Sequence, residues 1–139
     1  MFEEEAHKPT KPFLKWAGNK FRIIDRVDGI IEEYRGVRSK YIEPFGGSGA
    51  VIANVGRRFT GMKTYAEFNP ELVDLMRAIK DDLPALIKKT KVLFDQENNE
   101  SEHYYELRDD FNAYVKSRKT GIVQKSALFI YLNRHCFNG

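Results

Sequence analysis

The sequence predicts an α/β fold with an incomplete sheet, and three observations predict it. A short β-prone run from Lys40 to Phe45 meets three glycines in four positions, and a small apolar segment, residues 50–54, follows. This succession is typical of a strand, a tight turn and a helix. A second β-prone run spans Lys63 to Glu67, and from Pro70 onward apolar residues recur at helical spacing. We therefore expect two strands of a sheet, followed by a helical region.

Composition and charge permit a nucleic-acid partner without requiring one. The 139 residues carry a formal net charge of +3, and the pI is near 8.9, which allows association with a polyanion. The single cysteine, Cys136, excludes an internal disulfide and fits a reducing cytosol. No apolar run approaches the ~18 residues of a membrane span. Residues 1–12, acidic and then basic, are expected to form a flexible tail rather than a signal peptide.

The glycine turn is the first candidate binding site. Glycine adopts positive φ and allows close approach of another group, and a turn that feeds a helix N-terminus presents unpaired N–H groups to a nucleotide-like ligand. Glu67 follows Gly47 by about 20 residues, the distance at which dinucleotide-binding folds place an acid for ribose hydroxyls. A tight turn without a ligand is the alternative. The spacing Gly47-x-Gly49-x-x-Ile52 lacks the third glycine of the oxidoreductase fingerprint, and neither glycine-rich stretch has the Gly-Lys-Ser/Thr of a P-loop.

The segment Phe13–Lys20 holds the only tryptophan of the chain, Trp16, beside a glycine and between two lysines. Trp16 is either a hydrophobic anchor with solvated lysines around it or an aromatic face that stacks on a base, with the lysines for anionic groups. Apolar residues at helical spacing then predict a helix from Lys20 to Tyr34. Gly36 is expected to end it.

Local signals mark the start and the break of the next helix. Asn69, Pro70 and Glu71 predict a helix start, with asparagine as the cap, proline in the first turn and glutamate at the positive end. The run Asp81–Pro84 is expected to break this helix. A further helix is expected from Pro84 to about Gln96.

Two more helices complete the chain. Asn99 with Glu102 three residues later resembles a capping box, with asparagine in the cap, that opens one of them. The last helix is expected from Ile122 to about Asn133 and is strongly apolar. The chain then stops on Asn-Gly, which is a turn signal.

Other catalytic constellations are absent from the sequence. His7, His103 and His135 lie far apart and have no cysteine or acid partners at ligand spacing, so no metal site is expected. The run Gly46–Gly49 lacks the Gly-x-Ser-x-Gly frame of a serine hydrolase. The paired aspartates are expected on solvated helix surface.

Four stretches together resemble the Dam family, DNA adenine N6-methyltransferases that use S-adenosylmethionine. The stretches are Phe13–Lys20, Glu43–Gly49, Ala66–Asn69 and Tyr131–Gly139. They occur in the family's order, and four ordered stretches are far more specific than any one alone. The resemblance implies a Rossmann-like methyltransferase fold with an incomplete sheet over residues 13–69. It also implies that residues 70–139 are the start of an inserted, helical target-recognition domain.

By position, the resemblance implies a set of residues around S-adenosylmethionine. The glycine turn would lie beneath the methionine part of this cofactor. Glu67 stands where the family usually has aspartate, so a carboxylate for the ribose hydroxyls is kept. Asn19 replaces a usual glycine, and asparagine also adopts the left-handed conformation readily. The implied cofactor-binding residues are Trp16, Lys20, Phe45, Gly47, Gly49 and Glu67.

The resemblance also implies contacts with double-stranded DNA. Lys15 matches a family lysine that contacts the target DNA, and Phe137 and Asn138 match the start of a loop that enters the duplex beside the flipped adenine. His135-Cys136 departs from the more usual Tyr-Gly, which leaves the geometry of that loop open. Phosphate contacts are expected from among four arginines, with solvated surface as the alternative for each: Arg57, Arg58, Arg118 and Arg134.

One departure from the family pattern is an absence. The family's catalytic tetrapeptide, Asp-Pro-Pro-Tyr or a close variant, lies downstream of the matched stretches, and no Pro-Pro occurs in this sequence. We therefore expect no catalytic residue in this chain and a missing C-terminal portion. The hypothesis is the N-terminal part of an enzyme that methylates adenine in a GATC-like site, in the cytoplasm of a bacterial or phage-infected cell, at the nucleoid. The chain alone is expected to be inactive.

Two alternatives belong to other functional classes. A non-catalytic remnant or a split-enzyme fragment would keep only binding of S-adenosylmethionine or DNA. A Rossmann-type oxidoreductase, disfavoured by Ile52, would bind a nicotinamide dinucleotide in preference to S-adenosylmethionine.

Overall fold

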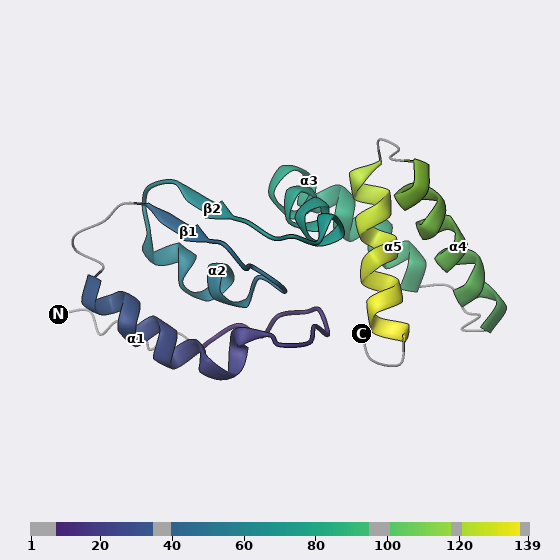
Figure 1. Ribbon diagram of the computed structural model, residues 1–139. Coiled ribbons are helices and arrows are strands. Elements are labelled where there is room, and N and C mark those ends of the chain that lie inside the picture. The colour runs from purple at the N-terminus through teal and green to yellow at the C-terminus, as the bar shows by residue number, and fades with distance from the viewer. Residues whose placement is uncertain (1–7, 35–39, 95–100, 118–120, 137–139) are drawn as a thin grey trace. The chain divides into compact units, whose positions relative to one another are not determined.

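The computed structural model describes residues 8–34, 40–94, 101–117 and 121–136, which form two compact units. The first unit is Met1–Glu67 and the second is Phe68–Gly139. Among the described residues, both strands belong to the first unit, and the second unit is helical (Figure 1). The fold thus contains a small parallel strand pair, and most of its regular structure is helix.

The first unit begins with a turn of 3₁₀ helix, η1 (Lys20–Ile23), which continues as α1 (Ile24–Tyr34). The predicted helix from Lys20 to Tyr34 is therefore confirmed, with a tighter first turn. The predicted stop at Gly36 lies outside the described residues.

Asn19 does not adopt the left-handed conformation that its residue type permits. Asn19 has a φ of −62° and a ψ of 138°, and its Oδ1 accepts a hydrogen bond from the N–H of Phe21. A helix-capping side chain needs this extended backbone, since only then does its oxygen reach the first free N–H groups of the helix. The preceding Gly18 takes the positive φ instead, at +69°.

Two short strands pair in parallel, and the chain between them forms a helix and a 3₁₀ turn. In order these elements are β1 (Tyr41–Glu43), α2 (Ala50–Asn54), η3 (Gly56–Arg58) and β2 (Lys63–Tyr65). The register places Tyr41 opposite Lys63 and Glu43 opposite Tyr65. Both predicted strands are present but end earlier than expected. The residues that follow each of them bond to the glycine turn or belong to it.

The helices α1 and α2 cover one face of the strand pair with an apolar core. Its buried residues are Ile24, Tyr41, Val51 and Val55. Successive side chains of a strand point to opposite faces, so Tyr41 and Glu43 of β1 are both buried, whereas Ile42 between them is 64% exposed. The alternation therefore carries a carboxylate into the interior of this unit.

The second unit starts with α3 (Pro70–Phe94). The Oδ1 of Asn69 accepts a hydrogen bond from the N–H of Glu71 at 2.9 Å, which confirms the predicted cap. A proline in the first turn has no N–H that would need a partner. The helix start is therefore determined by residues that are neighbours in the sequence.

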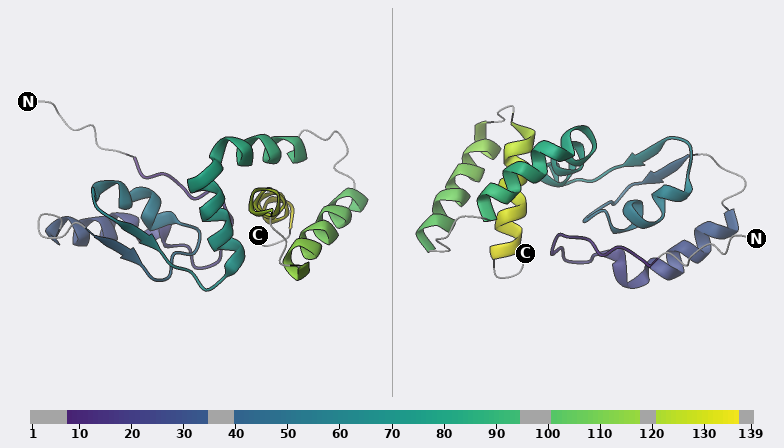
Figure 2. Two further views of the ribbon diagram at one scale, coloured as in Figure 1. Left: turned by 90° about the horizontal axis from the view of Figure 1, so that it is seen from above. Right: turned by 180° about the vertical axis from the view of Figure 1, so that it is seen from behind.

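The helix α3 kinks at Asp82, as its two segments in Figure 2 show. Asp82 has a φ of −153° and a ψ of 61°, which are not helical. Its Oδ1 accepts a hydrogen bond from the N–H of Ala85 at 3.1 Å and so caps the second segment, where Pro84 lies near the start. The predicted break at Asp81–Pro84 is confirmed in the form of a kink.

Two further helices, α4 (Ser101–Ser117) and α5 (Ile122–His135), complete the second unit. The helix α5 contacts both α3 and α4, and Figure 2 shows it nearly end-on between them. Asn99, the predicted cap of α4, lies outside the described residues. In the described ranges, no helix is long and apolar enough to cross a membrane. The core of this unit contains Leu72, Leu75, Ala78, Ala127, Leu128 and Tyr131.

We predict that Leu75→Ala destabilises the second unit, because Leu75 is fully buried between helices. Loss of a buried leucine side chain costs about 2–5 kcal/mol, from lost burial and the cavity left behind. Urea unfolding followed by circular dichroism at 222 nm reports mainly on α3, α4 and α5. The matched control is Leu83→Ala, because Leu83 lies on the same helix and is 45% exposed. Equal effects of the two variants would contradict the assigned core.

Candidate functional site

A cavity of about 190 Å³ lies in the first unit, beyond the carboxyl ends of β1 and β2. In open parallel sheets this is where ligands bind. Three stretches of chain form its wall: residues 16–20, the glycine turn after β1 with the start of α2, and the second residue after β2. The lining residues are Trp16, Ala17, Gly18, Asn19, Lys20, Phe45, Gly46, Gly47, Ser48, Ala50, Val51 and Glu67.

The cavity brings together most of the residues that the sequence indicated for a cofactor. Trp16, Lys20, Phe45, Gly47 and Glu67 all line it. Gly49 does not; it precedes α2 with a φ of +75°. Gly49 therefore shapes the backbone at the start of α2.

The glycine turn is held by hydrogen bonds within itself and from the end of β2. The N–H of Gly49 donates to the carbonyl of Gly46 at 2.9 Å. The N–H of Gly47 donates to Oε2 of Glu67 at 2.8 Å. The sequence argument expected the N–H groups of this turn to be unpaired and to face a ligand. For Gly47 that expectation is wrong, because the carboxylate of Glu67 takes its N–H.

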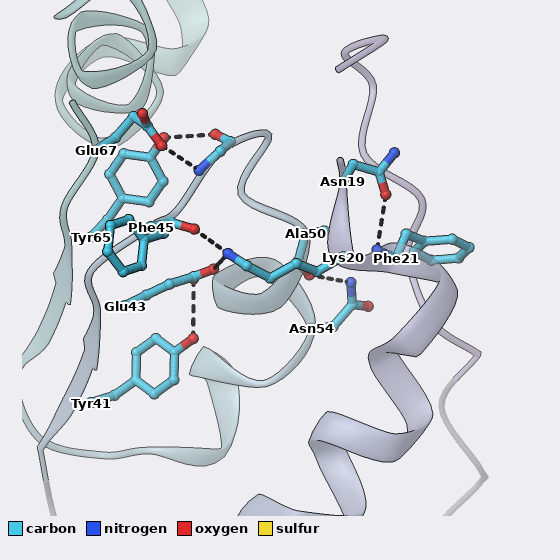
Figure 3. A network of polar contacts seen from close by, with 11 residues as sticks. Asn19, Lys20, Phe21, Tyr41, Glu43, Phe45, Ala50, Asn54, Tyr65 and Glu67 are labelled. Atoms are coloured by element: carbon cyan, nitrogen blue, oxygen red, sulfur yellow. Dashed lines mark hydrogen bonds and ion pairs between the residues drawn. The ribbon is translucent and has the colours of Figure 1, made fainter. Parts of the chain in front are cut away.

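A buried carboxylate, Glu43, lies beneath the turn (Figure 3). The Nζ of Lys20 is 3.2 Å from Oε1 of Glu43 and also donates to the carbonyl oxygen of Phe45. The hydroxyl of Tyr41 donates to Oε2 of Glu43 at 3.1 Å. Burial raises the pKa of the Tyr41 phenol above its ordinary value, and the charge of Glu43 raises it further. Lys20, the first residue of η1, thus joins η1 to β1 and to the turn.

Ser48 is a functional candidate that the sequence analysis did not single out. Its hydroxyl oxygen is buried and has no hydrogen-bond partner within the described structure, and the residue lines the cavity. Buried polar groups are nearly always paired in native proteins. An orphaned hydroxyl in a cavity wall therefore suits the polar group of a ligand. Its place inside the glycine turn was the available signal in the sequence.

The residues indicated for DNA contact fall in different units or outside the described residues. Lys15 is exposed in the first unit, next to Trp16, and does not line the cavity. Arg134 is exposed on α5 in the second unit. Phe137, Asn138 and Arg118 lie outside the described residues.

Two of the arginines proposed for phosphate contact hold the first unit together. The guanidinium of Arg58 lies 2.5 Å from Oδ2 of Asp28 and 2.6 Å from Oε2 of Glu32, both on α1. The Nε of Arg57 donates to the carbonyl of Asn54 at 2.8 Å. Arg58 therefore ties η3 to α1. Elsewhere in the described ranges, no three acidic, histidine or cysteine side chains gather as a metal site requires.

A sequence model of the D12 class N6 adenine-specific DNA methyltransferases matches residues 16–139. The chain belongs to this methyltransferase family. The predicted relationship to DNA adenine methyltransferases is thus confirmed, and the oxidoreductase hypothesis is left without support. The matched region contains every residue that lines the cavity.

Named relatives agree with the methyltransferase family. The type II methyltransferase M.MjaIII of Methanocaldococcus jannaschii is 36% identical over 138 residues, which are 94% of this chain and 47% of the relative. The DNA adenine methylase of Haemophilus influenzae is 36% identical over 143 residues, 99% of this chain and 46% of the relative. The DNA adenine methylase of Serratia marcescens is 34% identical over 134 residues, which are 95% of this chain and 44% of the relative. The chain thus spans about half the length of the curated relatives it matches.

We predict that the methyltransferase chain loses stability as the pH rises above about 10, the pKa of an unfolded tyrosine. The pKa of Tyr41 is raised by folding, so the unfolded chain releases this proton first. The contribution of such a tyrosine to stability is fully present below about pH 10. Above it, the free energy of unfolding falls by up to about 1.4 kcal/mol per pH unit for each such tyrosine. Urea unfolding between pH 9 and 11 measures the slope.

The variant Tyr41→Phe tests this assignment, because it removes one ionising phenol from the buried network. The slope of stability against pH should become shallower than in the wild type. Tyr65→Phe should act in the same direction, since the pKa of Tyr65 is also raised by burial. An unchanged slope in both variants would refute the assignment.

Proposed function

We propose that this chain is the cofactor-binding part of a DNA adenine methyltransferase, with S-adenosylmethionine held in the cavity beside the glycine turn. The main observation in support is that Trp16, Glu67 and the unpaired hydroxyl of Ser48 line one cavity. This cavity lies beyond the carboxyl ends of two parallel strands. Family membership supplies the reaction class, and the βαβ arrangement supports a Rossmann-like fold for the region 13–69.

The chemistry of the cavity wall fits the parts of this cofactor. The carboxylate of Glu67 suits ribose hydroxyls, the hydroxyl of Ser48 suits the amino-acid end, and Trp16 offers an aromatic surface. A Cβ atom at Gly47 would lie 3.7 Å from the Trp16 ring, so the turn passes close to this ring, and the φ of +52° favours glycine there. Small-molecule sites usually measure about 300–1,000 Å³, so a cavity of 190 Å³ takes part of the cofactor.

The bound cofactor supplies an electrophilic methyl group on a sulfonium. The residues of this chain bind and orient the cofactor. Methyl transfer to N6 of adenine requires the base to leave the duplex stack, in a GATC-like site by the family resemblance. We assign double-stranded DNA as the substrate because relatives are named DNA adenine methylases. Residues 70–139 would form the start of the target-recognition domain, after a tail at 1–12, with DNA contacts from Lys15, Arg134, Phe137 and Asn138.

A second candidate keeps the binding functions without methyl transfer, as a remnant or as one half of a split enzyme. The absence of any Pro-Pro in the sequence favours it for the 139 residues alone. Neither candidate expects the purified chain alone to transfer methyl groups, and an assay with tritiated S-adenosylmethionine and a duplex containing GATC tests this. Incorporation of tritium into DNA by the purified chain would eliminate the second.

We predict that Glu67→Gln weakens binding of S-adenosylmethionine by about 10- to 100-fold, the range for loss of a charge-assisted hydrogen bond. Isothermal titration calorimetry measures the affinity. The matched control is Glu102→Gln, because Glu102 is exposed on α4 in the second unit. Wild-type affinity in Glu67→Gln would remove Glu67 from the site. A folded wild-type chain that gives no heat would sink the cofactor assignment.

We predict that Lys15→Ala weakens binding to duplex DNA of any sequence and lowers the dependence of log K on log salt by about one, as loss of one phosphate contact does. Fluorescence anisotropy with a labelled duplex at several salt concentrations gives both quantities. Lys40→Ala is the control, because Lys40 is exposed and precedes β1, at the opposite end of the strand from the turn. Matching salt slopes for the two variants would argue against a DNA contact at Lys15.

A further inference from the structure

Tyr65, the last residue of β2, touches the glycine turn at two consecutive residues. Its ring occupies the space where a side chain of residue 46 would lie, because a Cβ atom at Gly46 would be 2.0 Å from Cε2 of Tyr65. Its hydroxyl donates to the carbonyl of Gly47 at 2.7 Å (Figure 3). Gly46 is not among the glycines with positive φ. Glycine is therefore required at position 46 by the tyrosine ring and not by the backbone.

Three consecutive residues at the end of β2 each make one hydrogen bond to the turn. The hydroxyl of Tyr65 binds the Gly47 carbonyl, and the carbonyl of Ala66 accepts the N–H of Gly46 at 3.0 Å. The carboxylate of Glu67 accepts the N–H of Gly47 at 2.8 Å. Both polar groups of the Gly47 backbone are thus fixed by side chains two residues apart. In an extended chain, side chains at this spacing lie on the same side.

The hydroxyl of Tyr65 remains a hydrogen-bond donor over a wide range of pH. Burial raises the pKa of the Tyr65 phenol well above its ordinary value, and the carboxylates of Glu67 and Glu43 raise it further. The hydroxyl therefore keeps its proton throughout the neutral range. Tyr65 is also absent from the residues that line the cavity, so any effect it has on a ligand there passes through the turn.

We propose that Tyr65 is a positioning residue for the cofactor. It fixes the Gly46–Gly47 backbone, so that Ser48 and Glu67 present their polar groups to the cavity in one geometry before the ligand arrives. Such preorganisation improves affinity because binding no longer has to order the turn. The inference rests on the proposed binding of S-adenosylmethionine at this cavity. It adds a residue that acts on the ligand through the turn, without lining the cavity.

The first test removes only the hydroxyl. In Tyr65→Phe we expect affinity for S-adenosylmethionine, measured by calorimetry on the full chain, to fall about five- to tenfold, as for loss of one hydrogen bond. The Gly47 amide should exchange with deuterium about tenfold faster without ligand, by nuclear magnetic resonance. The control is Tyr114→Phe, because the Tyr114 ring lies against Gly121 in the second unit in a similar way. It should change neither quantity.

The second test changes the size of both partners. Gly46→Ala should weaken binding at least about tenfold, because its methyl group collides with the Tyr65 ring. In a Tyr65→Ala background the same change should cost less than about twofold, since the ring is gone. Equal costs in the two backgrounds would show that the ring does not set the requirement for glycine, and would overturn the inference.

The outcomes distinguish this inference from the proposed function. If the wild type binds S-adenosylmethionine and Tyr65→Phe binds equally well, the positioning role is wrong and the cofactor site stands. If the wild type does not bind, the cofactor site fails and the positioning role fails with it. Unchanged deuterium exchange of the Gly47 amide in Tyr65→Phe would refute the proposal that Tyr65 fixes the turn, whatever calorimetry shows for the cofactor.

Discussion

The carboxylate of Glu43 is buried inside the first unit, where an uncompensated charge would cost several kcal/mol. Two donors offset this cost. The hydroxyl of Tyr41 comes from the same strand, and the ammonium of Lys20 comes from a segment 23 residues earlier. Lys20 also donates to the carbonyl of Phe45. The segment that carries Trp16 is therefore attached to β1 and to the turn through Lys20. Loss of this contact would leave the buried Glu43 charge without its cationic partner.

The location of the cavity follows from this attachment and from the parallel strand pair. Each strand has only three residues, yet the pairing brings the residues after β1 beside the residues after β2. Hydrogen bonds then pass between these two ends, from Gly46 to Ala66 and from Gly47 to Glu67. Trp16 and Lys20 close the remaining side. The parallel pair and the Lys20 contacts together gather residues from Trp16 to Glu67 around one cavity.

Features determined by near neighbours could be predicted from the sequence. The caps at Asn69 and Asp82 involve N–H groups two and three residues away, so the residue types alone indicated where α3 starts and kinks. Asn19 shows the limit of such an argument, because its residue type permits both the left-handed conformation and the cap, and the start of η1 selected the cap. Glu43 and Tyr65 were not singled out. Lys20 is 23 residues from Glu43, and Gly47 is 18 residues from Tyr65, so only the fold brings these partners together.

The same contacts explain why sequence motifs assign roles at this site only in part. Lys20 and Glu67 line the cavity, and each also binds the backbone of the turn. A substitution at either residue therefore changes two things at once, the contact with a ligand and the shape of the turn. Tyr65 binds the same backbone without lining the cavity. It is the position where the shape of the turn can be changed while the chemical groups that face the ligand stay the same.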